Sequence, residues 1–233
     1  MPEQRTLSMG LLMLPGFQNI DAVGSVDWIN SHSQDFLKAL NLPSLLPAQL
    51  IAKAPIMKWH YISHSLEPVQ ASSGPLQTPT TTYAKCPKLD YLIVPGPDPF
   101  TNLPNGCGAF LTERFKELKG LFLVCTASIA IARSIDILDG YKITSNKAIL
   151  KDIVNTPRYQ ELRKVKWVAD KRWVVDGKVW SAAGVVACLD LAAELVRREV
   201  NAEVVETIKN MAQVTARSDT PDEFAYLLKG VQF

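Results

Sequence analysis

The sequence predicts an α/β domain, and two observations carry that prediction. Short apolar runs alternate along the chain with longer amphipathic stretches, which is typical of strands alternating with helices. The 233 residues include 47% hydrophobic side chains, enough to bury a large core without disulfides or metals. Because repeats and linkers are lacking, residues 1–233 are expected to form one domain, with an insertion at about 31–50 and a helical extension at about 201–233.

Elements of the first half are placed by apolar runs and by the Gly and Pro residues that end them. In order, they are a buried strand at 7–14, a short helix at 23–30, the irregular insertion with one helical turn, and strands at 55–63, 69–72 and 91–94. A Pro-Gly-Phe turn at 15–17 ends the first strand, and Pro-Gly-Pro at 95–97 ends the last. Pro43 and Pro47 indicate that the insertion is irregular, since proline breaks helix interiors.

Elements of the second half follow the same pattern. In order, they are a helix at 110–119 closed by a glycine, a buried strand at 121–124, a helix at 126–132, strands at 143–145, 166–169, 173–175 and 178–181, and helices at 187–199, 202–214 and 222–229. Asp176-Gly177 is a good hairpin turn between the last two strands. In parallel α/β sheets ligands bind beyond the carboxyl ends of the strands, so the loops there are the first place to look for function.

Composition excludes several classes of function. The 25 Lys and Arg against 23 Asp and Glu give a net charge of +2, which offers no electrostatic case for a nucleic-acid or membrane partner. No apolar run is close to the length of about 20 residues that a helix needs to span a bilayer. The cysteines lack CxxC spacing, which predicts reduced thiols in a cytoplasmic protein. No metal site is expected either: His60 lies in a predicted strand, so it and His64 would not share a helical face, and His32 is interpreted as a solvated loop residue.

Cys125 is the first candidate for chemistry, because it lies where an apolar strand gives way to a helix. The unpaired N–H groups and the dipole of a helix N-terminus lower a cysteine pKa, and the thiolate is the nucleophilic form. The alternative is a buried structural cysteine, a common role for a free thiol. From the residues alone, Asp21 is best interpreted as a cap of the nearby helix.

Six segments in order carry a family resemblance. They are Gly-Phe-Gln-Asn-Ile-Asp-Ala-Val-Gly at 16–24, 68–74, 88–96, Val-Cys-Thr-Ala-Ser at 124–128, Leu-Asp-Gly at 138–140, and 181–190. Together they resemble the DJ-1/PfpI superfamily, and within it the isonitrile hydratase-like branch, over about residues 7–198. The resemblance implies a flavodoxin-like three-layer α/β/α sandwich with a mostly parallel sheet, usually a homodimer, and Cys125 on a nucleophile elbow. It also implies that Asp21 reaches the thiol from the loop after the first strand.

The resemblance further implies a cysteine-dependent hydratase, hydrolase or lyase that acts on a small electrophilic molecule. In an isonitrile hydratase, Cys125 attacks the terminal carbon, Asp21 is the acid/base, and Thr126 contributes a hydroxyl and a backbone N–H. Water then releases an N-substituted formamide, and no cofactor is required. The residues expected to bind the substrate are Gly96, Pro97, Asn146, Ala183 and Gly184.

Three departures from the family pattern leave alternatives open. Pro97 stands where many relatives have a glycine that donates its N–H, and proline has none to give. Asn146 stands where many place a histidine, and an amide cannot accept a proton at neutral pH. Alanines at 127, 182 and 183 replace glycines and reshape the pocket. The alternatives are a glyoxalase-like or specialised-metabolite enzyme, or a non-catalytic redox-sensing or chaperone-like dimer with Cys125 oxidised.

Overall fold

A seven-stranded sheet with the order β10-β11-β7-β6-β1-β2-β5 forms the centre of the computed structural model, which describes residues 5–156, 160, 162 and 164–233. Its strands are β1 (Thr6–Leu12), β2 (Ile56–Ser63), β5 (Thr81–Thr82), β6 (Tyr91–Val94), β7 (Gly120–Val124), β10 (Trp173–Asp176) and β11 (Val179–Ala182). Neighbouring strands are parallel, except that β10 and β11 form the antiparallel hairpin predicted at Asp176-Gly177. The sheet is therefore mostly parallel, as predicted.

Two small sheets lie outside this one. β3 (Val69–Gln70) pairs with β4 (Leu76–Gln77), and β8 (Lys142–Ile143) pairs with β9 (Lys166–Trp167). The helical elements are α1 (Asn19–Asn30), α2 (Gln34–Leu40), α3 (Ala48–Ile51), η1 (Tyr83–Lys85), α4 (Cys107–Glu117), α5 (Ala127–Ala132), α6 (Lys147–Val154), α7 (Ala187–Glu199), α8 (Ala202–Ala212) and η3 (Ala225–Leu228). Within the described residues, no helix is long and apolar enough to cross a membrane.

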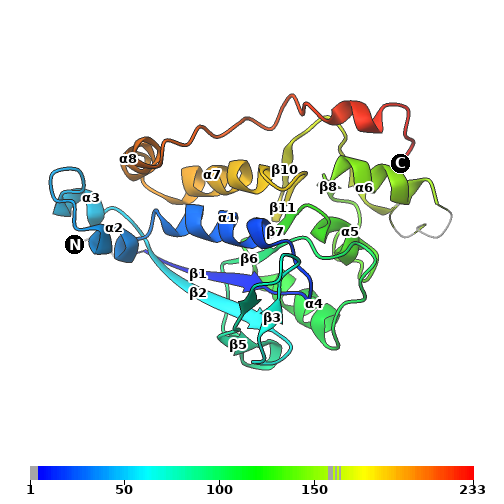
Figure 1. Cartoon of the computed structure of the whole chain (residues 1–233), viewed down its shortest axis with the longest axis horizontal. Helices are drawn as coiled ribbons and strands as arrows, with labels where there is room; N and C mark the ends of the chain where they lie inside the picture. The colour runs from blue at the N-terminus through cyan, green and yellow to red at the C-terminus, as the bar shows by residue number, and fades with distance from the viewer. Residues whose placement is uncertain (1–4, 157–159, 161, 163) are drawn as a thin grey trace.

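The helices form a layer on each face of the central sheet (Figure 1). α1 and α7 pack on one face, and α4, α5 and α6 pack on the other. The five parallel strands run in the order β2-β1-β6-β7-β11, which is the flavodoxin-like order. The expected three-layer sandwich is thus confirmed.

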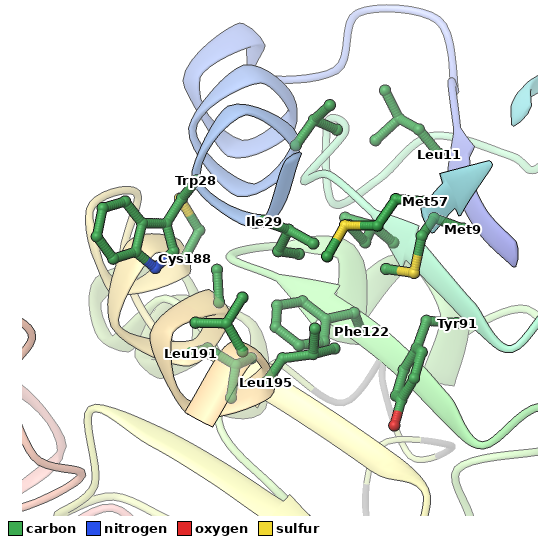
Figure 2. Close-up of a cluster of buried hydrophobic side chains, with 14 of the residues drawn as sticks. Met9, Leu11, Trp28, Ile29, Met57, Tyr91, Phe122, Cys188, Leu191 and Leu195 are labelled. Atoms are coloured by element: carbon green, nitrogen blue, oxygen red, sulfur yellow. The ribbon is translucent and has the colours of Figure 1, made fainter. Parts of the chain in front are cut away.

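Strand β7 shows why its sequence is one unbroken apolar run. Its side chains alternate between the two faces of the sheet, and both faces are covered. Phe122 and Val124 belong to the core beneath α1 and α7, whereas Leu121 and Leu123 belong to the core on the opposite face. Figure 2 shows Phe122 meeting Leu191 and Leu195 of α7 on the first side. This packing holds the end of β7 in place, and Cys125 directly follows that end.

Helix α1 begins earlier than predicted, and this changes the position of Asp21. The helix starts at Asn19, so Asp21 lies in its first turn and not in a loop. Its N-cap residue, Gln18, makes no side-chain cap. The carboxyl of Asp21 bonds elsewhere, so the interpretation of Asp21 as a helix cap is wrong.

Further elements differ from the predictions. Segment 31–50 holds two helices, α2 and α3, in place of one turn, because Ser33 caps α2 by accepting a hydrogen bond from the Phe36 amide at 3.2 Å. Helix α6 was not predicted, and Asn146 is its N-cap. The helix predicted at 222–229 is only the short 3-10 turn η3.

His32 is buried, so its interpretation as a solvated loop residue is wrong. None of its surface is exposed, and its ring packs edge-on against Trp28 with the ring centres 5.0 Å apart. Nδ1 lies 2.8 Å from the carbonyl oxygen of Trp28, while Nε2 has no partner among the described residues. Burial lowers the pKa of His32 to about 4, although the bond to Trp28 opposes that shift.

Candidate active site at the carboxyl ends of the strands

Cys125 occupies the sharp turn between β7 and α5 that the family resemblance predicts. Its backbone φ is +56°, in the left-handed region that side chains with a Cβ disfavour. Several bonds hold it there: its amide donates to the carbonyl of Ala182 at 2.9 Å, and its carbonyl accepts from Ser128 and Ser145 at 3.2 and 2.8 Å. Strain of this kind persists where the surroundings over-determine the conformation, which is a feature of functional sites.

Asn146 connects the thiol to helix α6. Its Oδ1 accepts a hydrogen bond from the Ile149 amide at 3.2 Å and so caps the helix. Its Nδ2 points to the sulfur of Cys125 at 3.7 Å. One amide therefore begins a helix with its oxygen and contacts the candidate nucleophile with its nitrogen.

Asp21 is a fully buried carboxyl with one oxygen unused. Oδ2 accepts a hydrogen bond from the Gly96 amide at 3.0 Å. Oδ1 is buried and finds no hydrogen-bond partner in the described part of the chain. Burial raises the pKa of Asp21 to about 7, and the bond from Gly96 only partly opposes this. A carboxyl that titrates near neutral pH is suited to moving protons.

Thr126 and Pro97 join the ends of β7 and β6. The Thr126 hydroxyl donates to the carbonyl of Pro97 at 2.5 Å, so its proton is already engaged. A Cβ on Gly96 would lie 2.7 Å from Oγ1 of Thr126 and 3.0 Å from Oδ2 of Asp21. Only glycine permits this approach. Pro97 thus contributes a carbonyl to the site and supplies no N–H.

The pKa of the Cys125 thiol is raised, whereas the sequence predicted that it would be lowered. Burial raises the pKa of Cys125 to about 11, and the negative charge of Asp21 adds to the shift. Hydrogen bonds from Asn146 and Thr126 act in the other direction but are weaker. Helix α5, which begins two residues after Cys125, spans only Ala127–Ala132. At neutral pH the resting site therefore holds a protonated thiol.

The predicted binding residues divide into two groups. Gly96 and Pro97 lie with Asp21 and Thr126, as described above. Asn146, Ala183 and Gly184 line a cavity of about 630 Å³ between the start of α6, the loop before α7 and the chain after α8. Cys125 does not itself line this cavity, but Asn146, which does, has its Nδ2 3.7 Å from the sulfur of Cys125.

Residues that hold the site in place were missed by sequence reasoning. Ser145 and Ser128 bind the Cys125 carbonyl, and Ser181 binds the Thr144 amide at 2.9 Å. A serine carries no signal of such a role in a single sequence, although Ser145 directly precedes Asn146. Among the described residues no three His, Cys, Asp or Glu side chains are grouped as metal ligands would be.

Comparison with known proteins agrees with this arrangement. Residues 44–198 match the model of the DJ-1/PfpI family. Isonitrile hydratase of Pseudomonas putida is 24% identical over 205 residues, covering 87% of this chain and 76% of that protein. The crystal structure of a THiJ/PfpI family protein from Pseudomonas syringae has a TM-score of 0.66 at 23% identity, over 95% of this chain and 80% of that one. Drosophila melanogaster DJ-1beta also has a TM-score of 0.66, at 16% identity, over 90% of this chain and 99% of its own.

The family match covers well over half of the chain, and the order of the strands and the turn at Cys125 agree with it. This protein belongs to the DJ-1/PfpI family.

Proposed function

We propose that this protein is a cysteine-dependent enzyme of the hydratase type that acts on a small electrophilic carbon such as an isonitrile. Asp21 is the observation that carries the proposal. A structural carboxyl would satisfy both oxygens, whereas Asp21 is fully buried with Oδ1 unpartnered among the described residues and its pKa raised to about 7. The negative charge of Asp21 also raises the pKa of the Cys125 thiol. The similarity to the Pseudomonas putida isonitrile hydratase supports the substrate class.

In the first step, the sulfur of Cys125 bonds to the terminal carbon of R–N≡C. The Asp21 carboxylate takes the thiol proton and delivers it to the same carbon, which gives the thioimidate R–N=CH–S–Cys125. The thiol pKa of about 11 means that this proton does not leave unaided at neutral pH, so a base beside the thiol is required. Asp21, with a pKa of about 7, is matched to that work.

In the second step, water adds to the thioimidate carbon and the nitrogen gains a proton, giving R–NH–CH(OH)–S–Cys125. The C–S bond then breaks, the hydroxyl proton returns through Asp21 to the sulfur, and R–NH–CHO leaves. Asn146 stabilises the departing sulfur, because its Nδ2 lies 3.7 Å from Sγ.

The absence of an N–H on Pro97 favours this chemistry over ester or amide hydrolysis. Acyl transfer develops a full charge on a carbonyl oxygen, and losing one donor to that oxygen costs about 10²–10³ in rate. The first addition to an isonitrile creates no oxyanion, so the missing donor matters less.

The proposed enzyme works as a homodimer, as the family resemblance implies. Three apolar side chains near the site support this: Ile20 and Val23 on α1 and Val186 before α7 are 40%, 38% and 55% exposed. Apolar groups gathered at a surface favour a protein contact. Light scattering on the purified chain measures the oligomeric state.

The proposal is tested with alkyl and aryl isonitriles, by following the formamide product with NMR. We expect turnover by the wild type, none by Cys125→Ala, and a loss of about 10²–10⁴ in kcat for Asp21→Asn. Cys86→Ala is the matched control, because that thiol is also buried but contacts the carbonyl of Pro87. Turnover by folded Cys125→Ala at the wild-type rate would reject the mechanism.

A further inference from the structure

A single segment of the C-terminal region forms one wall of the cavity beside the site. We call residues 213–231 the C-terminal strap. Figure 1 shows the chain leaving α8, running along the outer side of α7 and ending in η3 beside α6. Val214, Phe224 and Leu227 of the strap face the loop before α7 across the cavity of about 630 Å³. This volume is in the usual range for small-molecule sites.

The strap is anchored by its backbone and by a buried ion pair. The Arg217 amide donates to Oδ1 of Asp190 at 2.7 Å, and the Arg172 amide donates to the Asp219 carbonyl at 2.6 Å. Asp222 pairs with Lys147 at 3.2 Å, with side chains only 2% and 3% exposed. Lys147 follows Asn146 in the chain, so the anchor of the strap and the contact to the sulfur belong to the same end of α6. The wall is therefore held in a defined position.

The charges on the cavity wall cancel. Among the described lining residues, each cation has a carboxylate partner on the same wall. The pairs are Lys147–Asp222, Arg172–Asp190 at 2.6 Å and Arg217–Glu223 at 2.7 Å. A charged ligand would find no free opposite charge here and would lose its hydration.

The remaining wall is mostly apolar. Val185, Leu189, Val214, Phe224 and Leu227 contribute aliphatic and aromatic surface. Asn146 also lines the cavity, and its Nδ2 contacts the sulfur of Cys125 at 3.7 Å. Asn146 is thus shared between the cavity wall and the surroundings of the nucleophile.

We propose that the cavity binds the uncharged, apolar organic group of the substrate, an aryl or branched alkyl substituent, and that the strap determines its specificity. The reactive carbon would then project past Asn146 toward Cys125. This inference rests on the proposed function, in which Cys125 is the reacting group. It predicts that substrates bearing a carboxylate or an ammonium on that substituent are disfavoured.

Alkylation of Cys125 tests the cavity without requiring turnover. Rates are measured by peptide mass spectrometry for iodoacetamide, N-benzyliodoacetamide and iodoacetate, each normalised to a free cysteine peptide. We expect N-benzyliodoacetamide to react at least tenfold faster than iodoacetamide and to show saturation, and iodoacetate to be the slowest. Leu227→Trp, which fills the cavity, should reduce the benzyl-to-iodoacetamide ratio at least tenfold.

Tyr226→Trp is the matched control, because Tyr226 is 67% exposed, lies next to Leu227 and does not line the cavity. It should keep the wild-type ratio. Val214→Trp fills the cavity from another point of the strap and replaces Leu227→Trp if that variant does not fold. Circular dichroism checks folding.

Two results would overturn the inference: no preference for the benzyl reagent in the wild type, or a preference that both filling variants retain. A preference that disappears when the protein is diluted to monomers would also overturn it, since a second copy would then form the site. A benzyl preference without turnover of any isonitrile would keep the cavity and reject the reaction. Turnover of isonitriles without a benzyl preference would support the reaction and reject the cavity as the binding site.

Discussion

The amide of Gly96 donates a hydrogen bond to Oδ2 of Asp21 at 3.0 Å, although 75 residues separate them in the chain. This bond joins the first turn of α1, which follows β1, to the segment after β6, and β1 and β6 are the neighbouring parallel strands at which the strand order reverses. Ligand sites of doubly wound α/β sheets lie at such switch points. The Thr126 hydroxyl ties the end of β7 to the same place through Pro97. The segments that follow β1, β6 and β7 are therefore bonded to one another beside Cys125.

Gly96→Ala should damage the site and the fold together. Its Cβ would lie within 3.0 Å of Oδ2 of Asp21 and closer still to Oγ1 of Thr126, so at least one side chain must move. We expect a loss of about 1–3 kcal/mol in the free energy of unfolding, measured with urea, and slower alkylation of Cys125. Gly184→Ala is the control for stability, because its Cβ would meet nothing within 4 Å. Equal stabilities of the two variants would contradict the crowding at Gly96.

Asp21→Asn should stabilise the protein increasingly as the pH rises. Burial raises the folded-state pKa of Asp21 from its ordinary 3.8 to about 7, so the native state binds more protons than the unfolded state between these values. The wild type then loses stability as the pH rises from 4 to 7, by an amount on the order of a few kcal/mol. Asparagine carries no charge and can still accept the bond from Gly96.

The measurement is urea unfolding of wild type and Asp21→Asn at pH 4.5, 6 and 7.5. Asp27→Asn is the control, since Asp27 is exposed on the same helix. In the same series, kcat/KM of the wild type should fall as the pH drops below about 7, because the carboxylate is the required form. A stability difference that is constant across this range would mean that Asp21 titrates normally.

The sequence predicted the framework well because burial on both faces leaves a clear pattern. β6 was predicted at its observed bounds, and β7 within one residue, since both are unbroken apolar runs between turn residues. Helix α7 was likewise predicted at its bounds, 187–199, from one apolar face. The turn at Cys125 followed from the strand that ends before it and the small residues after it.

The contacts of the site could not be predicted in the same way. The role of Asp21 depends on Gly96, which reaches it only when β1 and β6 pair. The start of α6 depends on Asn146, whose capping signal is shared by many turn residues. The raised pKa of Cys125 depends on how much water the whole fold removes from the sulfur. Each is a tertiary property.

Asn146→Asp should separate reactivity from stability. Aspartate keeps an oxygen for the Ile149 amide, and a negative charge suits a helix N-terminus, so the free energy of unfolding should be unchanged or slightly higher. It removes the N–H beside the sulfur and adds a charge about 3.7 Å away, which raises the thiol pKa further. We expect the rate of Cys125 alkylation at pH 8 to fall at least tenfold.

Asn155→Asp is the control for that variant, because it adds the same charge at the other end of α6. It should leave alkylation of Cys125 unchanged. If Asn146→Asp reacts as fast as the wild type, the contact between its amide and the sulfur has no effect on the thiol.

His32 should act on stability in the direction opposite to Asp21. Burial lowers the folded-state pKa of His32 from its ordinary 6.5 to about 4, so the unfolded state binds more protons between these values. The contribution of His32 is therefore lost as the pH falls from 6.5 to 4, while protonation of Asp21 stabilises the fold over the same range. The two effects offset each other in the wild type.

His32→Asn, whose amide can donate to the Trp28 carbonyl, should remove the loss of stability that protonation of His32 causes at acid pH. The variant should therefore be more stable relative to wild type at pH 4.5 than at pH 7.5. Urea unfolding measures both values, with exposed His64→Asn as the control. A relative stability of His32→Asn that does not change with pH would show that His32 is protonated in the folded protein as readily as in the unfolded chain.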